Sequence, residues 1–137
     1  MKAYFDSSSF AKRFVEEEGS DKAETTCSQA TELGLSVICI PEVVSALNRR
    51  KREHTLTAAQ YDEAKQRLLD DVRDADIVNL TPSVVGSAIR ILETSPVRAM
   101  DALHVACAIE WSAELFASSD DRQLKAAKKA GLKTRQI

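Results

Sequence analysis

Short apolar segments of strand type alternate with amphipathic helical segments along the whole chain. Strands are expected at residues 2–6, 35–40, 76–80, 114–117 and 132–137. Because strands separated by helices pair in parallel and leave the helices on the faces of the sheet, this alternation predicts an α/β fold. We expect a three-layer α/β/α sandwich with a mostly parallel central sheet, formed by a single domain over residues 1–137.

Helical periodicity and capping residues mark the segments between these strands. Helices are expected around Phe10 and Phe14, over residues 21–32, from Pro41, over residues 57–75, from Pro82, from Pro96 and over residues 121–130. Gly34 is expected to close the second helix, and the apolar run Leu35–Ile40 to form a central strand covered on both faces. The helix at 57–75 has only a thin apolar stripe, made of Tyr61, Leu68 and Leu69.

The composition excludes several classes of protein. The 137 residues carry a formal net charge of −2, so any polyanion must be bound by a local basic patch or by a metal ion. No apolar run reaches the roughly 18 residues of a membrane span, and the first segment lacks the apolar core of a signal peptide. The 3 cysteines are far apart and lack metal-ligand spacing, which indicates buried thiols in a reducing compartment. These features predict a cytoplasmic protein without membrane contact.

Four acidic residues stand where the expected strands and helices end or begin: Asp6, Glu42, Asp101 and Asp120. In open α/β sheets, ligands bind beyond the carboxyl ends of the strands, so these side chains should gather in one cleft. Carboxylate oxygens suit hard divalent cations such as Mg²⁺ or Mn²⁺, which also relieve repulsion between clustered acids. The set therefore predicts a divalent-metal site and hydrolysis of phosphodiester bonds.

Each acid also has a structural explanation when it is taken alone. Asp6 and Asp120 are good helix caps, and Asp121, directly after Asp120, can serve either as cap or as ligand. Glu42 lies in a first helical turn, where the macrodipole favours negative charge. Asp101 is hardest to explain structurally, because it opens a helix that should be buried and an unpaired buried carboxylate is costly.

Polar and basic neighbours of the four acids are further candidates. Ser118 and Ser8 offer hydroxyl groups next to acids, although turn formation explains such hydroxyls too. His104 follows Asp101 by three residues, and on an apolar helix a hydrogen-bonded core histidine is the usual case. Basic side chains that can contact substrate phosphate, or simply form solvated helix surfaces, are Lys12, Arg13, Arg49, Arg50, Lys51 and Arg52.

The order of these short motifs resembles that of the PIN-domain ribonucleases, and in particular the VapC-like toxins of toxin–antitoxin pairs. The resemblance covers essentially the whole chain. Its motifs are Asp-Ser-Ser at 6–8, Pro-Glu-Val-Val-Ser-Ala-Leu at 41–47, Met-Asp-Ala-Leu-His-Val-Ala at 100–106, Phe-Ala-Ser-Ser-Asp-Asp-Arg-Gln-Leu at 116–124, and the closing segment 125–132.

This resemblance implies an endonuclease that cleaves single-stranded RNA with Mg²⁺ or Mn²⁺, through Asp6, Glu42, Asp101 and Asp120. Ser118 matches the family's polar position before the last acid, whereas Asp121 departs from the pattern and leaves two carboxylates as candidates there. The resemblance further implies a homodimer and a cognate antitoxin that occupies the groove.

Two other classes of protein compete with the nuclease. A non-catalytic α/β binding module that keeps this fold would use its acids as helix caps and would bind no Mn²⁺. A phosphoacceptor receiver domain also carries an acidic cluster after its first strand. It ranks last, because the strand at 77–80 lacks the acceptor aspartate that such a domain needs.

Overall fold

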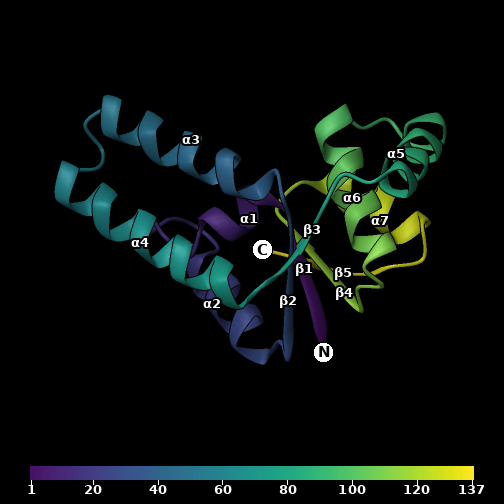
Figure 1. Cartoon of the computed structure of the whole chain (residues 1–137), viewed down its shortest axis with the longest axis horizontal. Coiled ribbons are helices and arrows are strands. Elements are labelled where there is room, and N and C mark those ends of the chain that lie inside the picture. The colour runs from purple at the N-terminus through teal and green to yellow at the C-terminus, as the bar shows by residue number, and fades with distance from the viewer.

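A five-stranded parallel sheet runs through the centre of the computed structural model, which describes residues 1–137 (Figure 1). The strand order is β3-β2-β1-β4-β5, and every neighbouring pair is parallel. The strands are β1 (Lys2–Phe5), β2 (Glu32–Ser36), β3 (Asp76–Val78), β4 (Leu115–Ser118) and β5 (Lys133–Gln136). The first strand thus lies at the centre, with chain order reversing on either side of it, which places ligand-binding positions beyond its carboxyl end.

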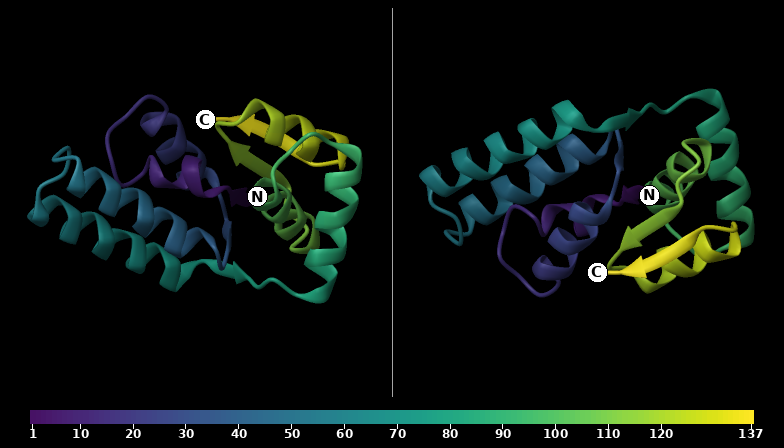
Figure 2. Two further views of the ribbon diagram at one scale, coloured as in Figure 1. Left: turned by 90° about the horizontal axis from the view of Figure 1, so that it is seen from above. Right: turned by 90° about the horizontal axis from the view of Figure 1, so that it is seen from below.

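Helices cover both faces of the sheet, as the alternating sequence predicts. One layer contains α1 (Ser7–Ala11), α2 (Ser20–Gln29), α3 (Cys39–Arg52) and α4 (Ala58–Asp74) (Figure 1). The opposite layer contains α5 (Pro82–Thr94), α6 (Ala99–Glu110) and α7 (Asp121–Lys129). Figure 2 shows the two layers from above and below, with α3 and α4 running side by side away from the sheet. The three-layer α/β/α prediction is confirmed.

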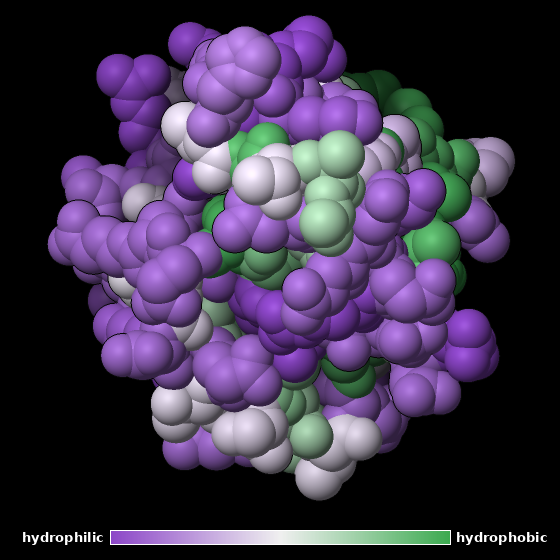
Figure 3. Space-filling model, turned by 90° about the vertical axis from the view of Figure 1, so that its left-hand side faces the viewer, coloured by the Kyte–Doolittle hydropathy of each residue, from purple (hydrophilic) through white to green (hydrophobic).

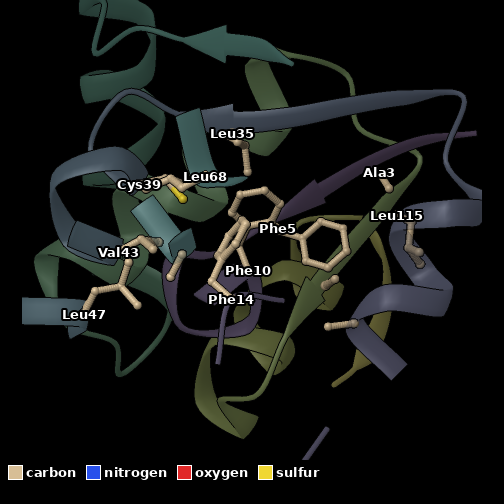
Figure 4. Packing of buried hydrophobic residues seen from close by; sticks show 13 residues of the cluster. Ala3, Phe5, Phe10, Phe14, Leu35, Cys39, Val43, Leu47, Leu68 and Leu115 are labelled. Carbon is tan, nitrogen blue, oxygen red and sulfur yellow. The ribbon is translucent and has the colours of Figure 1, made fainter. Parts of the chain in front are cut away.

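Two apolar cores hold these layers to the sheet because successive strand residues point to opposite faces. On one face the rings of Phe5 and Phe10 have centroids 5.7 Å apart, and those of Phe10 and Phe14 have centroids 5.2 Å apart (Figure 4). On the other face, Tyr4 stacks on Phe116 with ring centroids 5.7 Å apart. The carboxyl end of β1 is therefore fixed from both sides, and so is Asp6, which follows it.

The second helix and second strand differ from the sequence prediction. Helix α2 ends at Gln29, and Gly34 lies inside β2, opposite Tyr4 and Asp76, rather than at a helix end. A Cβ at Gly34 would lie 2.5 Å from the Trp111 ring, so the glycine allows a close tryptophan contact. The predicted strand at 35–40 was placed too late in the chain, because β2 spans Glu32–Ser36 and Cys39 opens α3. An unbroken apolar run does not separate a buried strand from the buried start of a helix.

Other boundaries lie within a few residues of the predicted ones, but two helical surfaces were less well anticipated. Leu69 of α4, assigned to its apolar stripe, is 42% exposed. Helix α5 buries Val84, Ala88 and Ile91, so several of its other apolar side chains face outward. No helix is long and apolar enough to cross a membrane. In Figure 3 the side of the molecule that carries α3 and α4 is mostly hydrophilic, with apolar atoms gathered toward one edge.

Candidate active site

The four predicted acids all lie at the carboxyl end of the sheet or at helix starts beside it. Asp6 directly follows β1, and Glu42 lies in the first turn of α3 after β2. Asp101 lies in the first turn of α6, and Asp120 is the N-cap of α7, two residues after β4. Strand direction and helix starts together bring residues that are up to 114 positions apart in the sequence to one edge.

Asp6 is the most deeply buried of the four, at 4% exposure. Its Oδ1 accepts hydrogen bonds from the Ser9 amide (3.0 Å) and hydroxyl (2.5 Å), which makes it the N-cap of α1. Its Oδ2 accepts from Ser8 Oγ at 3.2 Å and from Ser118 Oγ at 2.9 Å. The capping explanation therefore holds for one carboxylate oxygen, while the other is bound to the two serines that the sequence marked as candidates.

Glu42 is held by residues from three other elements. Its Oε1 accepts a hydrogen bond from Ser7 Oγ at 2.6 Å and lies 2.8 Å from His104 Nε2. The other ring nitrogen of His104, Nδ1, lies 2.8 Å from Tyr4 Oη. Burial raises the pKa of Glu42, but the hydrogen bonds from His104 and Ser7 outweigh burial and hold the pKa below its ordinary value. Glu42 is thus fixed in its ionised form.

Asp101, Asp120 and Asp121 line one open cleft of about 760 Å³. Burial raises the pKa of Asp101, and the negative charges of Asp120 and Asp6 raise it further. The carboxylate that sequence reasoning found hardest to explain therefore does sit among like charges. Such repulsion is what a bound cation would relieve.

A chain of hydrogen bonds joins the first turns of α6 and α7, next to this cleft. Ser118 Oγ lies 2.8 Å from Gln123 Oε1 and accepts from the Asp120 amide at 3.0 Å. Gln123, which is fully buried, donates from Nε2 to the Asp101 carbonyl at 3.2 Å. Sequence reasoning missed Gln123. Its position three residues after Asp120 in the first turn of α7 was the available signal.

Asp120 and Asp121 differ in their surroundings. Asp120 Oδ1 caps α7 by accepting from the amides of Arg122 (2.8 Å) and Gln123 (3.1 Å). Asp121 Oδ1 accepts from Gln136 Nε2 at 3.1 Å, and so turns toward β5. Only Asp120 contributes to the raised pKa of Asp101. Both line the cleft, but of the two it is Asp120 whose charge acts on Asp101.

The basic residues proposed from the sequence are placed less favourably. Arg13 pairs with Glu24 and Asp71, and Arg50 pairs with Glu17, so both guanidinium groups are already neutralised. Arg49 is exposed and forms no ion pair. Two arginines that sequence reasoning passed over, Arg98 and Arg122, line the acidic cleft itself. Their closeness in sequence to Asp101 and Asp120 was the signal for them.

The donor chemistry fits a hard divalent cation, because every acid at this edge offers carboxylate oxygens and serine hydroxyls lie next to them. The raised pKa of Asp101 is independent support, since it arises partly from unrelieved repulsion. No group of three or more His, Cys, Asp or Glu side chains is arranged to hold a metal ion in this structure. Side chains such as Asp120, which caps a helix, would have to share or reorient an oxygen to form a ligand set.

Comparison with known proteins assigns the family. The PIN domain model matches residues 3–129. Ribonucleases VapC45 and VapC49 of Mycobacterium tuberculosis are each 31% identical over 106 residues, or 77% of this chain and 74% of the relative. The chain belongs to the PIN-domain family, among its VapC-type ribonuclease toxins.

Solved structures share the fold at low sequence identity. VapC20 of Mycobacterium tuberculosis, described as a sarcin-ricin loop cleaving toxin, superimposes with a TM-score of 0.72 at 15% identity, covering 98% of this chain and 99% of its own. A toxin–antitoxin complex from Klebsiella pneumoniae gives 0.71 at 18% identity, with the same coverage. These similarities confirm the parallel α/β fold.

Proposed function

We propose that residues 1–137 act as a single nuclease domain that hydrolyses phosphodiester bonds of single-stranded RNA with Mg²⁺ or Mn²⁺. The observation that carries this proposal is that Asp101 and Asp120, from separate helices, line one cleft, where the charges of Asp120 and Asp6 join with burial to raise the pKa of Asp101. Three carboxylates from separate elements thus share one electrostatic environment beside an open cleft. The VapC ribonuclease relatives support RNA as the substrate class.

Each acid has a defined part in this proposal. Asp6, Asp101 and Asp120 would hold the cation, with Glu42, Asp121 and Ser118 as further candidate ligands. When bound, the ion would lower the pKa of an attacking water and stabilise negative charge on the phosphate. Ser118 donates a hydrogen bond to Asp6 Oδ2, and Glu42, held ionised by its lowered pKa, is suited to orient a water by accepting a hydrogen bond from it.

Substrate phosphates would be contacted by arginines, of which Arg98, Arg122 and Arg49 are exposed, while Arg13 and Arg50 would first have to leave their ion pairs. Arg98 and Arg122 line the cleft, and we add them to Arg13, Arg49 and Arg50, which were predicted from the sequence. Arg49 has no ion pair, so it is the best placed of those three to extend a basic rim. Charge neutralisation of this kind would make RNA affinity fall with salt.

The protein would act in the cytoplasm as a homodimer controlled by an antitoxin. Superimposable structures include toxin–antitoxin complexes, which supports an antitoxin partner. A second copy would cover the outer surface of α5, where Val85, Ile89 and Leu92 are 46%, 52% and 42% exposed.

We expect Ile89→Asp to shift the protein from dimer to monomer in analytical ultracentrifugation, whereas Ser83→Asp, on the same helix, should leave the dimer intact. A wild type that sediments as a monomer contradicts the dimer.

Replacement of Asp101 by Asn tests the proposed activity. The neutral amide keeps the side-chain shape but removes the charge, so cleavage of single-stranded RNA with Mn²⁺ should fall by about 100-fold or more. Asp62→Asn, on the exposed surface of α4, is the matched control and should cleave like the wild type. Cleavage that persists in Asp101→Asn at the wild-type rate would refute the proposal.

A non-catalytic binding module is the alternative, and the capping roles of Asp6 and Asp120 favour it. That alternative predicts no saturable Mn²⁺ binding and no rise of melting temperature with Mn²⁺. The nuclease predicts both, because a ligand that binds only the folded state stabilises it. Calorimetric titration of the wild type with Mn²⁺ separates the two.

A further inference from the structure

The imidazole of His104 is buried and bonded on both sides, although neither the proposed metal set nor the substrate contacts include it. The side chain is 3% exposed. It connects Tyr4 on β1 to Glu42 on α3, and Ser7 on α1 lies 3.0 Å from its Nε2. Residues from four elements therefore meet at this ring. A histidine that only filled the core would not need an acid of the candidate site as its partner.

The directions of the bonds follow from what each group can donate. The ionised Glu42 carboxylate can only accept, so His104 donates from Nε2–H to Oε1, 2.8 Å away. A neutral imidazole that donates at one nitrogen accepts at the other, so Nδ1 accepts from the Tyr4 hydroxyl at 2.8 Å. The Nε2–H group therefore points to Glu42 Oε1, with Ser7 Oγ as a second donor to the same oxygen.

We propose that Tyr4, Ser7 and His104 form a positioning unit that fixes the Glu42 carboxylate for the RNA cleavage proposed above, on which this inference rests. Both donors end on Oε1, whereas Oε2 accepts no hydrogen bond within the protein and stays available to a cation, a water or the substrate. A free glutamate at this half-exposed position would sample several rotamers, and fixing one of them costs side-chain entropy. The hydrogen bonds of the unit offset that entropy cost during folding, before any cation or substrate binds.

The core fixes the unit itself. Tyr4 is fully buried and stacks nearly parallel on Phe116, at an interplanar angle of 9°. The His104 ring meets Tyr4 edge to face, with centroids 6.1 Å apart. Neither ring can turn without disturbing the core between the sheet and α6. The orientation of Glu42 is thus set by packing that lies beneath the cleft, which is how supporting residues hold catalytic side chains.

Tyr4→Phe is the sharpest variant, because it removes only the hydroxyl and keeps the stacked ring. In the metal-free protein, we expect the ¹⁵N signal of His104 Nδ1 to shift, because Nδ1 loses the Tyr4 hydroxyl as its hydrogen-bond donor. Loss of a supporting bond of this type typically weakens metal binding or activity by about 10–100-fold. We expect a decrease in that range for Mn²⁺ affinity by calorimetry and for the cleavage rate. His54→Asn provides the control and the spectral assignment, since His54 is exposed and asparagine tolerates its positive φ of 60°.

Two further variants separate positioning from packing. His104→Gln can place an amide N–H near the position of Nε2, so it should retain more Mn²⁺ affinity than His104→Leu, which offers no donor. Ser7→Ala removes one of the two donors to Oε1 and should cause a smaller loss than His104→Leu. Melting temperatures are measured for all variants, and cleavage is expressed per folded molecule.

The outcomes are distinguishable. Tyr4→Phe and Ser7→Ala that keep wild-type Mn²⁺ affinity and cleavage overturn the positioning role, and so does a loss of melting temperature that leaves affinity per folded molecule unchanged. Equal affinities of His104→Gln and His104→Leu overturn it too. A wild type that neither binds Mn²⁺ nor cleaves RNA overturns the proposed function, and the positioning role with it, by a separate measurement.

Discussion

The two ends of the parallel sheet use the same strands but arrange charge in opposite ways. At the amino end, Trp111 covers Gly34 and donates its indole N–H to Asp76 at 3.1 Å. Lys2 Nζ lies 4.4 Å from the Trp111 ring centroid and donates to the Trp111 carbonyl at 2.8 Å. Lys2 and Asp76 are therefore each matched with a dipole or an aromatic ring.

At the carboxyl end, like charges are kept together. Asp101 has a raised pKa because it is partly buried and lies beside Asp120 and Asp6. A domain selected only for stability would gain nothing from this arrangement, since repulsion lowers the free energy of unfolding. We therefore expect the Gly34–Trp111 contact at the amino end to serve the fold and the acids at the carboxyl end to serve the proposed cleavage. Substitutions at the two ends should therefore have opposite effects on stability and activity.

The largest expected effect separates Asp120 from its neighbour Asp121 at the carboxyl end. Asp120 shares the electrostatic environment of Asp101, whereas Asp121 is bonded to Gln136 on β5. We expect Asp120→Asn to lower kcat/KM for RNA by about 100-fold and Asp121→Asn by less than about threefold. Steady-state cleavage of a fluorescent single-stranded RNA measures both. An equal loss in the two variants would mean that Asp121 also faces the ion.

The next largest effect is a loss of stability at the amino end. A Cβ on Gly34 would lie 2.5 Å from the Trp111 ring, so Gly34→Ala must displace the tryptophan. Overpacking of this kind costs about 1–3 kcal/mol. Urea unfolding should show that decrease, while cleavage per folded molecule stays at the wild-type value. Gly86→Ala is the matched control, because its Cβ would meet only Arg90 Nη1 at 3.8 Å. A fall in cleavage per folded molecule in Gly34→Ala would mean that the two ends of the sheet are coupled.

The sequence was sufficient for the architecture and for the positions of the acids, because alternation of strands and helices dictates a parallel sheet whose carboxyl ends share one edge. It was insufficient where tertiary contacts override local pattern. In the sequence Gly34 is typical of a helix end. In the structure it is a glycine because the ring of Trp111, far along the chain, occupies the space of a side chain. The apolar run at 37–40 looks like a strand although its second half begins α3.

Side-chain partners within the site were the part that sequence reasoning could not supply. His104 was expected to be a hydrogen-bonded core residue, and it is buried and bonded, but nothing in its spacing reveals that Glu42 is its partner. The same applies to Arg13 and Arg50, which looked free in sequence and are neutralised by acids from other helices. Which charges remain unpaired depends on contacts between distant segments.

The smallest expected effect is a gain of stability at the carboxyl end. Because the folded-state pKa of Asp101 is raised, the proton binds more tightly to the folded protein than to the unfolded chain. The stabilisation from that proton is complete below the unfolded pKa and is lost as the pH rises through the folded pKa. At pH 7 the ionised Asp101 therefore weakens the metal-free fold.

Asp101→Asn should accordingly raise the melting temperature of the metal-free protein at pH 7, by a few degrees at most for this half-exposed group. The gain should shrink as the pH falls toward about 4, where the wild-type carboxyl becomes protonated as well. With saturating Mn²⁺ the order should reverse, because only the wild type gains stability from the ion. Differential scanning fluorimetry across pH, with and without Mn²⁺, measures the gain at pH 7, its decrease at low pH and its reversal by the ion. A variant that is less stable than the metal-free wild type at pH 7 would show that Asp101 serves the fold, and the contrast between the two ends of the sheet would no longer hold.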